Sequence, residues 1–281
     1  MATTTTRRQK RQRDPDKGTA FLMSFLLFFV GVALASSAIA ITTVFNRDYT
    51  SRIMTQPTQT KQFQKILLTN LSPLIENTSL SGDDLKLIVT TGVAQATANQ
   101  TVAGVYSNSA RPFATGPVDQ AITNHLTNQG TSADDAATAV TVINNNIDRR
   151  VQSYARYGAK QLANDRTKLA WSALGLLIAT ILLLMIHLWS MRGDILATLW
   201  SFSLVNMLGS GAAYLVTVFG AKEIPDMMPI SLGVAGQKLL IVYAQHVVAS
   251  ARMIYGYVAG AALIILLVLL ALKITAAPKR V

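Results

Sequence analysis

The sequence predicts an all-α membrane protein with four transmembrane helices and an α-helical extracytoplasmic bundle inserted between helices 1 and 2. Two observations carry this prediction. Four long runs of the 281-residue chain contain no Asp, Glu, Lys or Arg, and one long polar segment, 47–168, separates the first run from the second. A spanning helix needs roughly 20 mostly apolar residues, because lipid offers the backbone no hydrogen-bond partner outside the helix.

The N-terminal segment 1–18 is expected to be a basic cytoplasmic tail, because Lys and Arg near a span mark the cytoplasmic side of a membrane. It contains Arg7, Arg8, Lys10, Arg11, Arg13 and Lys17. The net charge of +11 therefore points to contact with membrane lipids, and no nucleic acid is expected as a partner. The first transmembrane helix, 19–46, is expected to stay as an uncleaved anchor, since its apolar stretch is longer than that of a signal peptide.

The extracytoplasmic segment, 47–168, has helical apolar spacing. Pro73 is expected to kink or end its first helix. Ser81 and Asp84 have the spacing of a capping box, followed by an apolar stripe from Leu85 to Ala103. A short helix is expected at 118–128, and Ser132 caps another. The acidic pairs that follow Ser81 and Ser132 are interpreted as helix caps. No proline lies between Pro117 and Pro225, so this last helix is expected to run unbroken into the second span, 169–191.

The remaining elements follow from the other uncharged runs. A short link, 192–194, forces a tight hairpin between the second span and the third, 195–221. A second extracytoplasmic segment, 222–252, begins with a proline-bounded loop, 225–229, and continues as an amphipathic helix, 236–252. The fourth span, 253–272, leads to a cytoplasmic tail, 273–281. Four spans place both termini in the cytoplasm of a multi-pass plasma-membrane protein.

The third span is unusually polar for a membrane helix. Asn206, Ser203 and Ser210 form its polar face, and His187 adds an ionisable ring near the end of the second span. Two interpretations are open. The polar groups can bond a neighbouring helix, or they can line a path for a solute or an ion. For His187, the alternative to a functional role is that its side chain reaches the inner membrane interface.

Two further sets of residues indicate contact surfaces. Small residues at a spacing of four permit close approach of helices; these are Gly256, Gly260, Gly209 and Ala213. Basic residues precede the second span and are interpreted either as a solvated face or as a possible anionic-lipid contact; these are Arg149, Arg150, Arg156, Lys160, Arg166 and Lys168.

The sequence contains none of the catalytic motifs considered below. The chain has no cysteine, its three histidines lack metal-ligand spacing, and no serine-nucleophile pattern occurs. We therefore expect no enzyme, no catalytic residues, no cofactor and no metal. The sequence predicts a structural, sensory or regulatory accessory subunit of a bacterial cell-envelope complex, in contact with another membrane protein or with copies of itself. The alternative is a transporter or channel subunit that uses the polar face of the third span.

Overall fold

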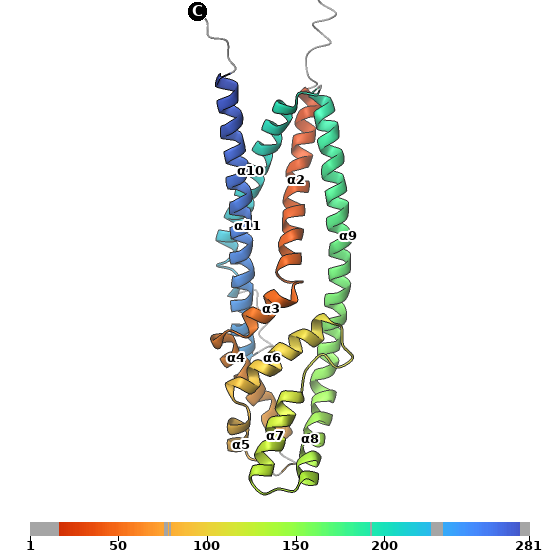
Figure 1. Cartoon of the computed structure of the whole chain (residues 1–281), viewed down its shortest axis with the longest axis vertical. Helices are drawn as coiled ribbons and strands as arrows, with labels where there is room; N and C mark the ends of the chain where they lie inside the picture. Colours follow the sequence, from red (N-terminus) through yellow and green to blue (C-terminus); the bar gives the residue numbers. More distant parts are fainter. Residues whose placement is uncertain (1–16, 76–77, 79, 192, 226–232, 276–281) are drawn as a thin grey trace, which may run out of the picture. The chain divides into compact units, whose positions relative to one another are not determined.

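A computed structural model of the chain describes residues 17–75, 78, 80–191, 193–225 and 233–275 (Figure 1). Most of both predicted tails, Arg192 and most of the predicted proline-bounded loop lie outside the described residues. The chain divides into two compact units. The span unit comprises Met1–Ile39, Ala170–Gly220 and Ala249–Val281, and the helical domain comprises Ala40–Leu169 and Ala221–Val248.

Among the described residues, four helices are long and apolar enough to cross a membrane, which matches the predicted number of candidate spans. They are α2 (Lys17–Thr42), α9 (Ser153–Ser190), α10 (Ile195–Gly220) and α11 (Gly233–Thr275). Their large apolar side chains point outward in many places, as Phe21, Met185 and Ile264 do. Such exposure is unfavourable in water over a wide area and is typical of surfaces that meet lipid or another protein.

Helix α11 is longer than the sequence indicates. The predicted junction between an amphipathic helix and the fourth span, at 252/253, lies inside one continuous helix. The reason is that nothing in the segment breaks a helix, since no proline occurs between Pro229 and Pro278. The prediction placed the junction at a charge, but Arg252 stays in the helix and donates a hydrogen bond from Nη2 to the Thr217 carbonyl at 3.3 Å.

Short helices with one hydrophobic core make up the helical domain. They are α3 (Arg47–Met54), α4 (Pro57–Leu71), η1 (Ser72–Leu74), α5 (Gly82–Ile88), α6 (Thr91–Tyr106), α7 (Gly116–Asn128) and α8 (Ala133–Ile147). The core draws side chains from α4, α5, α7 and α8, among them Leu67, Leu85, Ile122, Leu126 and Ile143. Each of these lies on the apolar stripe of an amphipathic helix, so burying the stripes together excludes water from all of them.

Helix ends in the domain follow local sequence signals. The predicted capping box is present, with Ser81 and Asp84 each accepting the other's backbone N–H, and Ser132 caps α8. Helix α4 ends before Pro73, as expected. The apolar stripe from Leu85 to Ala103 is divided between two helices, α5 and α6. Thr90 begins a new helix there, because its hydroxyl accepts the Val93 N–H at 3.3 Å.

The predicted unbroken path into the second span is present, with one irregular turn. Helix α8 passes into the π-helical turn η2 (Asp148–Gln152), and α9 follows directly. A π-turn inserts an extra residue into the helix, and such turns often occur where side chains are presented to another part of the protein.

Candidate functional site

The polar face of α10 lies against α2 in the span unit. Ser24 and Ser201 share a hydrogen bond of 2.8 Å between their hydroxyl groups, and Ser203 and Ser210 are buried. The Asn206 amide donates to the Phe202 carbonyl at 2.9 Å, within its own helix. Ser201 and Asn206 therefore bond to protein groups in this arrangement, as expected for polar groups that bond within and between helices.

Asn206 meets α2 through its oxygen. A Cβ atom added at Gly31 would lie 3.5 Å from Asn206 Oδ1, which is ordinary contact distance. The seam between α2 and α10 at this level, bounded by Leu27 and Gly209 among others, has no room for a water molecule. The structure thus brings Asn206 and Ser210 together at a closed helix–helix contact.

The small residues that the sequence singles out differ in their surroundings. A Cβ at Gly209 would lie 3.0 Å from a Val32 methyl carbon, so α2 and α10 approach each other closely there. Ala213 packs against the buried cluster of Ile39, Ala251 and Tyr255. Gly256 lies beside the Tyr214 ring, at 3.9 Å for an added Cβ, whereas a Cβ at Gly260 would meet nothing within 4 Å. Gly260 therefore leaves space for a neighbour beyond the described residues of this chain.

His187 is buried in the span unit. Its side chain is 0% exposed, and neither ring nitrogen has a hydrogen-bond partner among the described residues. Its backbone carbonyl accepts the Ser190 hydroxyl at 2.7 Å. A buried imidazole without a partner is costly, which makes His187 a site of local polarity inside the span unit.

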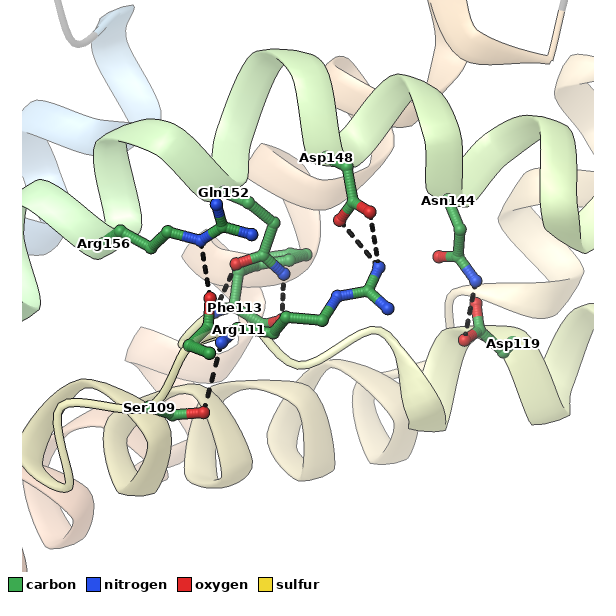
Figure 2. Close-up of polar contacts among 9 residues, drawn as sticks. Ser109, Arg111, Phe113, Asp119, Asn144, Asp148, Gln152 and Arg156 are labelled. Atoms are coloured by element: carbon green, nitrogen blue, oxygen red, sulfur yellow. Dashed lines mark hydrogen bonds and ion pairs between the residues drawn. The ribbon is translucent and has the colours of Figure 1, made fainter.

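Only part of the predicted basic stripe is exposed without a partner in the described structure. Arg156 donates from Nε to the Ala110 carbonyl at 2.5 Å (Figure 2), so its guanidinium holds a loop of the domain. Lys160, Arg166 and Lys168 are exposed, with no carboxylate at ion-pairing distance in the part of the chain that the structure describes. Arg149 is also exposed, and the side chain of Arg150 lies outside the described set.

A polar clamp holds the loop 109–113 to the π-turn (Figure 2). The Gln152 side chain is 0% exposed; its oxygen accepts the Phe113 N–H at 3.2 Å and its amide donates to the Phe113 carbonyl at 2.6 Å. Arg111 Nη2 donates to both carboxylate oxygens of Asp148 at 2.7 Å. Sequence reasoning missed this clamp, because residues 37 to 39 positions apart in the sequence carry no local signal of their pairing.

Asp84 and His125 form a second polar contact in the domain. His125 Nε2 lies 2.8 Å from Asp84 Oδ1, and Gln129 donates to the same oxygen at 3.2 Å. Hydrogen bonds from Ser81, and then from His125, hold the pKa of Asp84 well below its usual value. The carboxylate is therefore a stable anion near neutral pH that joins the α5 N-terminus to α7, and it is a weak general base.

A hydroxyl cluster joins α3, α6 and the first part of α11 within the domain. Thr50 Oγ1 lies 2.7 Å from the Tyr106 hydroxyl and 2.9 Å from that of Tyr243, and Tyr106 also donates to the Val44 carbonyl. Burial raises the pKa of Tyr106 to about 12. Tyr106 is consequently a neutral phenol near neutral pH, and the cluster supports the fold rather than proton transfer.

Residues for a metal site do not converge in the described part of the chain: no group of three or more His, Asp or Glu side chains is placed to hold an ion. The function must therefore be argued from surfaces and packing. No protein-family model matches the chain, and neither curated proteins nor solved structures give a match to its sequence or fold.

Proposed function

We propose that the protein is a membrane-anchored accessory subunit of a bacterial cell-envelope complex. Its four apolar helices anchor it in the plasma membrane with both termini in the cytoplasm, and its helical domain lies outside and binds a partner. It performs no catalysis. The two-unit organisation supports this proposal, because a domain with its own hydrophobic core can present a surface independently of the spans.

The observation that carries the proposal is a pair of exposed aromatic side chains on the domain. Tyr154 is 80% exposed and Tyr157 is 72% exposed. They are three residues apart on α9 and so occupy the same helix face. Tyrosine is enriched at protein interfaces, because its ring buries a large area while its hydroxyl keeps a polar contact. An accessory subunit needs such a surface.

The alternative, a transporter or channel subunit, depended on a solvent-accessible polar face on the third span. In this arrangement Asn206 and Ser210 line a seam with no room for water. The packing therefore favours the accessory role over transport.

Photo-crosslinking tests the accessory role in the native membrane. Tyr154 or Tyr157 is replaced by p-benzoylphenylalanine in the full chain, and Asn124, an exposed residue of α7, is replaced as the matched control. Irradiation is expected to give one discrete adduct with a second envelope protein from the tyrosine positions and none from Asn124. Adducts between two copies of this chain alone, or no protein adduct at all, would refute the accessory role.

A further inference from the structure

A groove runs between α4 and the first part of α11 in the helical domain. Two hollows, of about 230 and 570 Å³, share Gln62 and Lys238 as lining residues, so they adjoin along one seam. The first also involves Thr58 and Val242, and the second Asn70. As residue numbers rise along α4 they fall along α11, so the two helices run antiparallel. At a rise of about 1.5 Å per residue, the seam is roughly 18 Å long on α4.

The groove has a positive charge. Lys65 and Lys238 line it, and both side chains are exposed. Helix α4 contains no Asp or Glu, and α11 has none up to Val248. Neither ammonium group forms an ion pair with any residue that the structure describes. Two uncompensated cations at one groove favour an anionic ligand, above all one with phosphate oxygens.

Apolar side chains line both hollows beside the lysines. Ile66 and Leu68 line it from α4, and Leu239, Ile241 and Val242 line it from α11. An elongated apolar seam of this kind gains stability when a hydrocarbon chain replaces water along it. A ligand that combines an anion with a hydrocarbon chain would use both features, whereas a free phosphate or sugar phosphate would use only the first.

A buried polar atom in the groove adds a third requirement for the ligand, namely a hydrogen-bond donor. Gln59 lines the smaller hollow and is only 3% exposed, and its Oε1 has no hydrogen-bond partner within the described structure. An unpaired buried acceptor is unfavourable until a donor reaches it. A ligand with a hydroxyl group near its anionic end would supply that donor.

We propose that the groove between α4 and α11 binds a monoacyl glycerophosphate or a closely similar anionic amphiphile. The phosphate contacts Lys65 and Lys238, the glycerol hydroxyl donates to Gln59 Oε1, and the acyl chain lies along the apolar seam. The site goes beyond the accessory role, because it requires neither a partner protein nor a particular orientation of the domain.

A photoreactive ligand tests the site. The full chain, held in amphipol to avoid competing detergent, is irradiated with a monoacyl glycerophosphate that carries a diazirine at the end of its acyl chain, and modified peptides are identified by mass spectrometry. Adducts are expected on α4 or on residues 234–242 of α11. Unlabelled monoacyl glycerophosphate should suppress them at a concentration at least about tenfold lower than an uncharged monoacylglycerol. Equal suppression by the two lipids, suppression by glycerol phosphate alone, or adducts confined to the uncharged spans would overturn the proposal.

Charge variants separate the site from general attraction to the basic chain. The double variant Lys65→Gln and Lys238→Gln is expected to weaken labelling about tenfold. The matched control, Lys61→Gln with Lys222→Gln, removes the same charge from two exposed lysines that do not line the groove and should label as the native chain does. Equal loss in both double variants would reject a specific site.

Gln59→Leu tests the hydroxyl contact separately. It should reduce competition by monoacyl glycerophosphate severalfold but leave unchanged the competition by an alkyl phosphate, which has no glycerol hydroxyl. A merely structural Gln59 would give no such difference between the two competitors. Thermal unfolding of each variant shows whether the fold is retained, and a ratio between two competitors is independent of a modest loss of folded protein.

Discussion

Gln152 forms hydrogen bonds with both backbone groups of Phe113, so that one side chain closes the loop 109–113 onto the π-turn between α8 and α9. Because the amide is fully buried, its loss leaves two backbone groups without partners where water does not easily replace them. The loop is thereby held by a residue at the point where the helix departs from α-helical geometry.

Gln152→Ala should destabilise the domain by about 1–3 kcal/mol, the cost of unsatisfied buried polar groups. Hydrogen–deuterium exchange is expected to rise at the amides of residues 109–113. Gln120→Ala, at an exposed position of α7, is the control and should exchange like the native protein. Unchanged protection of the loop amides in Gln152→Ala would show that the clamp does not measurably stabilise the loop.

Gly104→Ala should also destabilise the domain, through overlap of atoms. An added Cβ would lie 2.5 Å from the Pro112 carbonyl oxygen, a backbone atom that can move only with its loop. The expected cost is about 1–3 kcal/mol, as for other overpacked sites. Gly158→Ala in α9 is the matched control, since a Cβ there meets nothing within 4 Å and alanine favours helix. If both alanine variants unfold at the same temperature, the close approach at Gly104 is not sterically tight.

The stability of the domain should fall in acid through Asp84. The folded-state pKa of this carboxyl lies below the usual 3.8, so its stabilising effect is present above about pH 4 and is lost as pH falls towards the lower folded value. The unfolding temperature of the native chain between pH 7 and pH 3 should therefore decline more steeply than that of Asp84→Asn. Asp134→Asn, at another helix start with an exposed side chain, should keep the native profile. If the unfolding temperature of Asp84→Asn fell just as steeply between pH 7 and pH 3, the loss of stability in acid would not come from Asp84.

Gly209→Leu should loosen the contact between α2 and α10. The native approach leaves only 3.0 Å between an added Cβ and Val32, and the Phe28 ring lies at 3.5 Å. The larger side chain must push the helices apart, so the protein in mild detergent should aggregate at a lower temperature. Gly211→Leu is the control, because a Cβ at Gly211 meets nothing within 4 Å. The idea fails if the Gly211 variant is the less stable of the two.

The exposed part of the basic stripe should bind anionic lipid. Reversal of Lys160, Arg166 and Lys168 to Glu is expected to weaken binding of the protein to vesicles that contain phosphatidylglycerol, with a smaller effect at high salt. Co-sedimentation with vesicles measures this binding. Reversal of three exposed basic residues elsewhere in the domain that do not line the groove, Arg52, Lys61 and Lys86, is the charge-matched control. Equal losses in the two triple variants would assign the effect to net charge alone.

The sequence by itself determined the class of the protein. Uncharged runs of sufficient length predict spanning helices wherever they occur, because the requirement for internal backbone hydrogen bonding in lipid acts on every residue of the run. Local signals were also readable: the capping box at Ser81, the cap at Ser132 and the end of α4 before Pro73 depend on residues within one helical turn. Each of these was predicted correctly.

Only the tertiary structure decided which polar residues meet. Asn206 was visible in the sequence, but its contact with α2 depends on how two helices pack. Gln152 with Phe113, His125 with Asp84, and the groove around Gln59 join segments far apart in the chain. A single sequence carries periodicity within a helix but no record of distance between helices, so these pairings arise only when the apolar stripes are buried against one another.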